Sequence, residues 1–397
     1  MSDRKRTAGL FVGTIYILTF FLTVQYALTV YINSSFLKQF FAESEIGFIY
    51  TAGSLAAIIC LARISEALRR YGQFRLAFLS MFFNLIVLTG LAMINLGLAP
   101  IFIVLPSIFV LFVLLATTTL LNRFFLAFYL EEFTKNTETG NNQGIFLTTM
   151  NLAIALAPFV VGKILSNGDY HRLYLLASFF LIISMIIFVL KLIDIKDIPY
   201  NAPPFMETGR RIWHTKNIYN IFASNFLLEF FYSWMTIYTP IYLNNNLGFS
   251  WSEIGTMFSL MLTPFVILQY PLGKIADRYL GEKEILTAGF IIMAVATGAL
   301  SFITVNSFWV WTGILFATRV GASAIEVMNE TYFYKKVRPV DSDIMSFYRN
   351  AQPLAYIAGP ALASVFLMFL DFKYIFLTLG IIMLGGVYFS LGIKDTK

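Results

Sequence analysis

The chain is poor in charge, cysteine and histidine. Of its 397 residues, 13% are charged, one is Cys and two are His. A single cysteine, Cys60, excludes a disulfide framework and a thiolate metal cluster. The sequence also has no Gly-rich loop of the nucleotide-binding type, no metal-ligand spacing and no nucleophile–base pair. It therefore predicts no metal, no cofactor and no enzymatic activity.

Hydrophobic residues are abundant instead. They make up 58% of the chain, Phe alone accounts for 42 residues, and the mean hydropathy is +0.74, more apolar than a soluble domain can bury in a core. A membrane-spanning helix needs about 20 mostly apolar residues. The sequence therefore predicts an all-α integral membrane protein with twelve transmembrane helices. The predicted spans are 10–32, 46–67, 76–96, 100–130, 144–165, 173–191, 217–243, 253–274, 285–305, 307–334, 344–369 and 373–393.

A polar segment separates the first six predicted spans from the last six. It reads DIKDIPYNAPPFMETGRRIWHTK, and its prolines and charges favour a surface linker over another span. The predicted domains are an N-terminal six-helix bundle (1–193), a cytoplasmic linker (194–216) and a C-terminal six-helix bundle (217–397).

The basic residues predict the orientation in the membrane. Most of the 28 Lys and Arg fall in loops on one side, the side of both chain ends. The positive-inside rule then places both termini in the cytoplasm. We expect a multi-pass protein of the plasma (inner) membrane whose first span is retained as its own insertion signal. This topology accounts for the net charge of +6, so nucleic acid is not an expected partner, whereas the lipid bilayer is.

The two halves share short sequence matches in register. The tetrapeptide SEIG occurs at 44–47 and at 252–255, and the dipeptide RY follows at the same offset, beginning at Arg70 and at Arg278. Because the register holds over a whole predicted helix, we interpret the halves as a parallel repeat of six spans. Such a repeat is typical of transporters.

A loop motif follows the second span of the second half. It reads GKIADRYLGEK, in which the glycine permits close helix approach, the aspartate offers a carboxylate at a helix end, and the basic residues can pair with acids or lipid headgroups. It resembles the loop signature of the major facilitator superfamily, G-x-x-x-D-R-x-G-x-K, with Leu280 as one extra residue. The motif residues are Gly273, Asp277, Arg278, Gly281 and Lys283.

The resemblance covers essentially the whole chain and has several implications. It implies two pseudo-symmetric six-helix bundles, a small-molecule substrate, alternating access and a monomer. It also implies that the motif braces the cytoplasmic gate, with Asp277 facing the N-terminus of the fifth helix near Gly144, where the helix dipole favours an anion. The competing interpretation is a solvated loop that only obeys the positive-inside rule.

Polar residues within the spans predict the substrate path, because ionisable groups there are costly unless they face protein or water. Helical spacing places Asn225, Glu229 and Tyr232 on one face of the seventh span, and Arg319 and Glu326 on one face of the tenth. The predicted substrate-cavity residues are Tyr26, Arg123, Asn225, Tyr232, Arg319, Gln352 and Tyr356. This set suits sugars, amino acids or amphipathic compounds. The alternative is that such residues only hydrogen-bond between helices.

Two acids are candidates for proton coupling. Glu229 lies close to the centre of its span, where a carboxylate could load and release a proton as access to water alternates. Glu326 is the second candidate. Near the predicted cytoplasmic side, Arg349 is expected to form an intramembrane ion-pair network with Glu326 and Glu330. The alternative role for Glu229 is a structural partner of Arg319.

These observations lead to one predicted function and one alternative. The predicted function is a secondary active transporter that moves a small solute by alternating access, with protons as the coupling ion. The alternative is a membrane sensor or receptor that retains this fold without transporting a solute.

Overall fold

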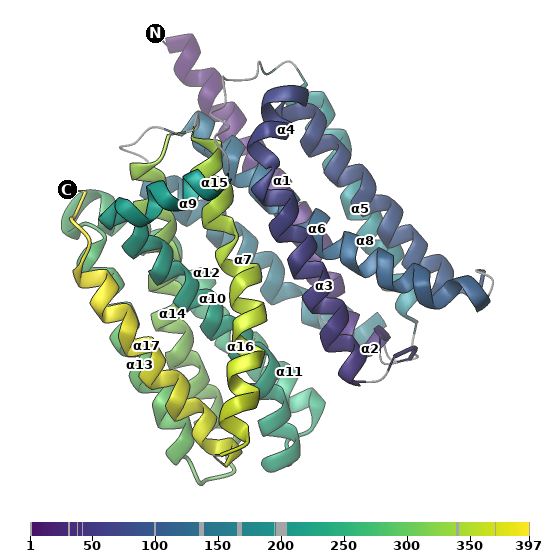
Figure 1. The fold of residues 1–397 in the computed structure, drawn as a ribbon, viewed down its shortest axis with the longest axis vertical. Coiled ribbons are helices and arrows are strands. Elements are labelled where there is room, and N and C mark those ends of the chain that lie inside the picture. Colours follow the sequence, from purple (N-terminus) through teal and green to yellow (C-terminus); the bar gives the residue numbers. More distant parts are fainter. Residues whose placement is uncertain are drawn as a thin grey trace. The chain divides into compact units, whose positions relative to one another are not determined.

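All regular structure in the computed structural model is helical within the residues that it describes (Figure 1). These residues are 2–30, 32–37, 39–41, 43–98, 101–134, 139–164, 169–193, 195, 205–338, 341–369 and 371–396. They fall into two compact units. Unit 1 comprises Met1–Thr134, Leu152–Phe205 and Pro339–Asn350, and unit 2 comprises Lys135–Asn151, Met206–Arg338 and Ala351–Lys397.

Unit 1 is built mainly from helices of the first half. Its elements are α1 (Ser2–Val30), α2 (Asn33–Leu37), α3 (Glu43–Ala62), α4 (Ile64–Tyr71), α5 (Gln73–Asn95), α6 (Ile101–Phe133), the C-terminal part of α7 (Thr139–Ile164), α8 (Tyr170–Leu192) and α15 (Ser342–Arg349). Helix α1 packs on α8, and α5 packs on both α6 and α8. Hydrogen bonds reinforce the α5–α6 pair: Asn84 Nδ2 donates to Thr118 Oγ1 at 2.7 Å, and Ser80 Oγ donates to the Thr118 carbonyl at 3.2 Å.

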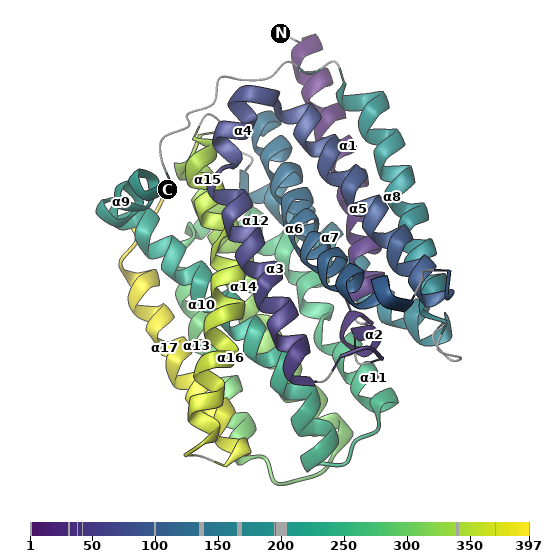
Figure 2. The ribbon, with the colours of Figure 1, turned by 45° about the vertical axis from the view of Figure 1, so that its right-hand side comes forward.

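Unit 2 contains most helices of the second half. Its elements are α9 (Phe205–His214), α10 (Lys216–Ile241), η3 (Tyr242–Asn246), α11 (Trp251–Met261), α12 (Thr263–Ile275), η4 (Ala276–Leu280), α13 (Lys283–Ala299), η5 (Leu300–Phe302), α14 (Phe308–Lys336), α16 (Ala351–Leu367), η6 (Phe372–Tyr374) and α17 (Ile375–Leu391). Helix α13 lies between α14 and α17 (Figure 2). The backbones meet there at glycines, because a Cβ on Gly321 would lie 2.5 Å from the Gly289 carbonyl oxygen.

Several helices are long and apolar enough to cross a membrane. Within the described ranges there are eight by length and hydropathy, or nine if α3 and α4, which meet at a 52° bend, form one span. The remaining three predicted spans fall on α7 and α10, which begin with polar turns, and on α16, which has 17 residues. Large apolar side chains such as Leu190 and Val295 are 72% and 65% exposed, as expected of lipid-facing positions. The predicted all-α membrane fold is confirmed.

The boundaries of the two units can be compared with the predicted domains. The change from unit 1 to unit 2 at Phe205–Met206 falls inside the predicted linker 194–216, of which 194 and 196–204 lie outside the described residues. The described part of the linker contains the short helix α9. However, Lys135–Asn151 belongs to unit 2 and Pro339–Asn350 to unit 1. The division into 1–193 and 217–397 therefore stays a prediction.

Candidate functional site

The extra residue in the loop motif is accommodated by a change of helix type. Helix α12 continues into η4, a π-helical turn in which the Gly281 N–H donates to the Ala276 carbonyl at 3.2 Å. A π-helical turn closes over five residues instead of four, so it accommodates Leu280 without breaking the helix. Gly281 then ends the turn with a φ of 81°, a left-handed conformation that glycine adopts without steric cost.

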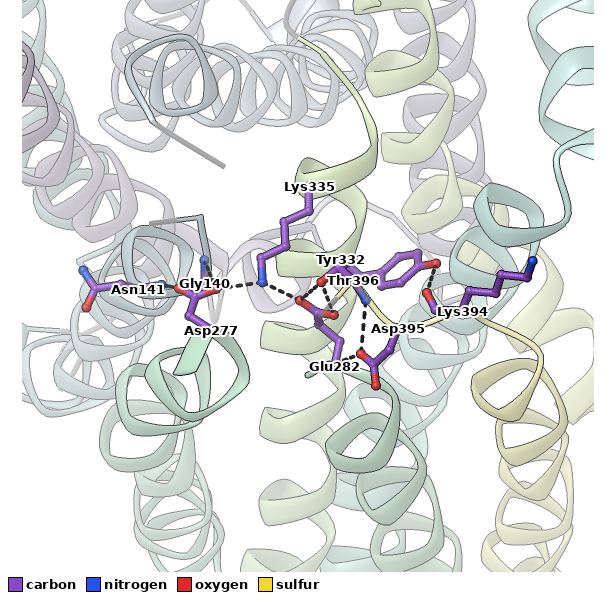
Figure 3. Close-up of polar contacts among 9 residues, drawn as sticks. All are labelled: Gly140, Asn141, Asp277, Glu282, Tyr332, Lys335, Lys394, Asp395 and Thr396. Atoms are coloured by element: carbon purple, nitrogen blue, oxygen red, sulfur yellow. Dashed lines mark hydrogen bonds and ion pairs between the residues drawn. The ribbon is translucent and has the colours of Figure 1, made fainter. Parts of the chain in front are cut away.

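Asp277 is bound by the first turn of α7. Its carboxylate accepts hydrogen bonds from the N–H of Asn141 at 2.9 Å and from the N–H of Gly140 at 3.3 Å (Figure 3). The first N–H groups of a helix have no partner within the helix and carry the positive end of its dipole, so a carboxylate is a favourable ligand. The contact is with the fifth-span helix, as expected, but it lies at Gly140 and Asn141 instead of near Gly144.

Glycines on both helices permit this contact. A Cβ on Gly273 would run into the carbonyl oxygen of Gly140, and a Cβ on Gly144 would lie 2.9 Å from the Gln269 carbonyl oxygen. The obstructing atoms belong to the backbone, which cannot move aside as a flexible side chain can. Glycine is therefore required for α7 and α12 to meet backbone to backbone.

Replacing Gly273 by Ala should separate α7 from α12. We expect a loss of about 1–3 kcal/mol in unfolding free energy from overpacking, together with weaker binding of Asp277 to α7. The measurement is thermal unfolding of the purified protein. Gly313→Ala is the matched control, because nothing lies within 4 Å of a Cβ at Gly313 in α14. Equal melting temperatures for the two variants would show that the close approach is not needed.

Lys335 is the cation that pairs with Asp277. It lies in the last turn of α14, and its Nζ is 2.8 Å from Asp277 Oδ1 and 2.6 Å from Glu282 Oε1. The Glu282 side chain is fully buried, and those of Asp277 and Lys335 are 8% and 13% exposed. One ammonium group thus compensates two buried carboxylates. By sequence, Lys335 is one of the many basic residues in loops, and Glu282 occupies a position that the motif leaves unspecified.

The C-terminal segment completes this cluster. The Thr396 hydroxyl donates to Glu282 at 2.6 Å, and Asp395 Oδ1 accepts from the Glu282 N–H at 2.9 Å (Figure 3). The Tyr332 hydroxyl donates to the Lys394 carbonyl at 2.7 Å. We call this set the Asp277 cluster. Its members are Gly140, Asn141, Asp277, Glu282, Tyr332, Lys335, Lys394, Asp395 and Thr396.

The basic residues of the motif differ in exposure. The ion pairs that the structure shows for Asp277 and Glu282 lead to Lys335. Arg278 is exposed, and Lys283 is half-buried at the start of α13. The pairing role suggested for Arg278 and Lys283 stays a prediction.

A second polar group lies deeper in unit 2, within the spans. Glu326 Oε2 accepts from Gln269 Nε2 at 2.8 Å and from the Tyr232 hydroxyl at 3.4 Å. Gln269 Oε1 in turn accepts from Asn151 Nδ2 at 3.0 Å. The structure thus brings together Tyr232 and Glu326, both predicted site residues. It adds Gln269 and Asn151, which lie on helices that sequence periodicity did not connect.

Other predicted residues interact with Tyr232 or lie on the same helix. Tyr232 also interacts electrostatically with Glu229 and Arg319. Arg319 is 4% exposed, and its guanidinium lies 4.9 Å from the centre of the Phe231 ring. Asn225 is buried two turns before Tyr232 on α10. Glu229, Tyr232, Arg319 and Glu326 therefore share one polar environment.

The predicted roles of these residues and of the remaining ones all stay predictions. Gln352 and Tyr356 lie on α16 in unit 2, half-buried, whereas Tyr26 and Arg123 belong to unit 1. Arg349 also belongs to unit 1, where its guanidinium lies 5.7 Å from the Tyr348 ring centre, while Glu326 and Glu330 belong to unit 2. Among the described residues, no group of three or more His, Cys, Asp and Glu could hold a metal ion.

The family of the chain follows from its sequence. The model of the Major Facilitator Superfamily matches residues 15–252 and again residues 221–396. Together these matches cover nearly the whole chain. The chain therefore belongs to the major facilitator superfamily, and it is a multi-pass membrane transporter of that superfamily.

Solved structures share the fold at low sequence identity. The human organic anion transporter MFSD10 (TETRAN) is 12% identical, with a TM-score of 0.78 over 97% of this chain and 99% of that chain. The proton:xylose symporter XylE is 14% identical, with a TM-score of 0.75 over 100% and 97%. A bacterial homologue of the iron transporter ferroportin, in an outward-facing state, is 12% identical, with a TM-score of 0.76 over 96% and 98%. No curated protein matches the chain in sequence.

Proposed function

We propose that this transporter moves a small solute by alternating access and that the Asp277 cluster is part of its gate. The observation that carries the proposal is the binding of Asp277 to the first turn of α7. By sequence, α7 belongs to the first six spans, and α12 belongs to the second six. A charge–dipole contact of this kind forms and breaks without covalent change, as a gate between two halves requires.

We further propose that protons supply the driving force. Two acids, Glu229 and Glu326, lie on helices of spanning length and share a polar environment with Tyr232 and Arg319. Ionisable residues within spans are costly to keep and commonly mark proton or substrate paths. Glu229 remains the principal candidate for coupling and Glu326 the second.

The substrate has to be found by experiment, because a shared fold does not carry a shared substrate. The three similar structures are described as an organic anion transporter, a proton:xylose symporter and a homologue of an iron transporter. We propose a small-molecule solute. A screen for thermal stabilisation by metabolites and drugs would identify a ligand, because binding to the folded state raises apparent stability.

Uptake in proteoliposomes then tests the proposed function. We expect the identified ligand to accumulate when a proton gradient is imposed and only to equilibrate without one. A ligand that stabilises the protein but never crosses the membrane would instead favour a sensor or receptor with this fold. We also propose a monomer in the plasma membrane. Both termini are proposed to lie in the cytoplasm, which the distribution of Lys and Arg supports.

Glu229→Gln should separate the two roles considered for Glu229. If Glu229 couples protons, the variant should lose gradient-driven accumulation while it still binds and exchanges substrate. If Glu229 is a structural partner of Arg319, the variant should lose thermal stability instead. Accumulation and melting temperature are measured on the same preparation, with Glu326→Gln in parallel. Full proton-driven accumulation in Glu229→Gln would rule out coupling at Glu229 and leave Glu326 as the candidate.

A further inference from the structure

Three residues on one face of α12 and η4 contact the N-terminal part of α7. Gln269, Gly273 and Asp277 are spaced four residues apart and therefore lie in one row. Asp277 binds the N–H groups of Gly140 and Asn141, Gly273 touches Gly140, and Gln269 binds Asn151. The row joins the Asp277 cluster at one end to Glu326 at the other.

The residues at both ends of this row also form polar contacts with α14. Asp277 pairs with Lys335 at 2.8 Å, and Gln269 donates to Glu326 at 2.8 Å. Glu326 lies on α14, as Lys335 does. The contact between α7 and α12 is therefore linked at one end to a buried ion pair and at the other end to a carboxylate within the spans.

The amide of Gln269 has a fixed orientation. Its side chain is fully buried, its Oε1 accepts from Asn151 Nδ2, and its Nε2 donates to the Glu326 carboxylate. Exchanging the oxygen and nitrogen would place an NH₂ group against the NH₂ of Asn151 and a carbonyl against a carboxylate, which loses both bonds. Both hydrogen bonds are therefore donated in the same direction, from Asn151 to Gln269 and from Gln269 to Glu326.

We propose that Asn151 and Gln269 form an amide relay through which the charge on Glu326 sets how firmly α7 is held on α12. The proposal rests on the proposed proton coupling and deepens it. When a hydronium ion transfers a proton to a carboxylate oxygen of Glu326, its own O–H bond breaks to leave water, a carboxyl O–H bond forms and the negative charge is lost. The bond from Gln269 then loses its charge assistance, and the polarised bond from Asn151 to Gln269 weakens with it.

Other ionisable groups lie on the helices that carry Glu326 and its partner Tyr232. Helix α10 presents Tyr232 and Glu229, and α14 itself carries Arg319 and Glu330. On the sides of α12 and α7, the groups of the relay are neutral amides. Substituting Glu326 with Gln, which mimics the protonated acid, is therefore a cleaner test than a change of pH alone.

Hydrogen exchange of the α7 backbone amides tests the relay and requires no substrate. The amides of residues 139–151 are followed by mass spectrometry in the full-length protein, in the wild type, Glu326→Gln, Gln269→Leu and the double variant. We expect each single substitution to speed exchange roughly tenfold, the equivalent of about 1.4 kcal/mol. The double variant should exchange no faster than Gln269→Leu alone, because both substitutions interrupt one chain. If Gln269→Leu does not fold, Asn151→Ala replaces it at the other end of the relay.

Two further variants make the outcome specific. Ser224→Ala removes a buried hydrogen bond to Asn329, 2.7 Å long, that joins α10 to α14 in unit 2, and it should leave exchange in 139–151 unchanged. Asp277→Asn should speed exchange in the first turn of α7 whether or not the relay exists. Unchanged exchange in Glu326→Gln, or additive effects in the double variant, would overturn the relay. If Asp277→Asn still has its effect, the proposed gate stands without the relay.

Discussion

A Lys335→Met variant is expected to lose about 3–5 kcal/mol of unfolding free energy, the usual cost of removing one partner from a buried ion pair. Lys335 is the ion-pair partner that the structure shows for both Asp277 and Glu282, at 2.8 Å and 2.6 Å, and both carboxylates are buried. Methionine fills a similar volume but leaves two negative charges close together without that cation. Equilibrium unfolding in detergent measures the loss.

The neighbouring residue supplies the control for this variant. Lys336 is exposed, with its Nζ 5.7 Å from the centre of the Tyr332 ring, so Lys336→Met should cost less than about 1 kcal/mol. Adding Asp277→Asn to Lys335→Met should recover part of the loss, because it removes one of the two uncompensated charges. A Lys335→Met variant as stable as Lys336→Met would show that the cluster does not stabilise unit 2.

Asp277→Asn should slow or abolish transport while the protein still inserts and folds. Asparagine has nearly the same shape as aspartate but no charge, so it loses both the charge-assisted bonds to the first turn of α7 and the ion pair with Lys335. Stability should fall less than in Lys335→Met, because Lys335 keeps its pair with Glu282. The measurement is uptake of the identified ligand, compared with expression level and melting temperature.

Glu284→Gln is the matched control for Asp277→Asn. Glu284 is an exposed acid in the first turn of α13, seven positions after Asp277, so the substitution removes one negative charge from the same region without touching α7. It should transport like the wild type. Wild-type turnover in Asp277→Asn would remove the gating role from the cluster.

The fold was largely predictable because the constraint that sets it is local. In a bilayer, every backbone polar group must be hydrogen-bonded within the protein, so an apolar run of spanning length has to be helical. Gly273 and Asp277 were predictable for a similar reason, because a glycine and an acid one turn apart must share a helix face. The π-helical turn η4 accounts for Leu280, which the motif showed only as an extra residue.

The partners of these residues were not predictable, because they are distant in sequence. Lys335 lies 53 positions from Glu282, Thr396 lies 114 positions from it, and Asn151 lies 118 positions from Gln269. Basic residues near helix ends satisfy the positive-inside rule whether or not they form an ion pair. The sequence therefore did not distinguish Lys335 from the other basic residues near helix ends. Gln269 and Asn151 lie on the eighth and fifth predicted spans, whereas the polar residues from which the substrate path was predicted lie on other spans.

The sequence by itself determined that this chain is a helical membrane protein, and that a glycine and an acid lie one turn apart at a helix end. Both properties depend on residues that are neighbours along the chain. Only the tertiary structure decided that Asp277 binds α7 and Lys335, and that Gln269 joins Asn151 to Glu326. An ion pair or a hydrogen bond requires approach to about 3 Å. The packing of α7, α12 and α14 sets those distances, and hydropathy and periodicity do not encode them.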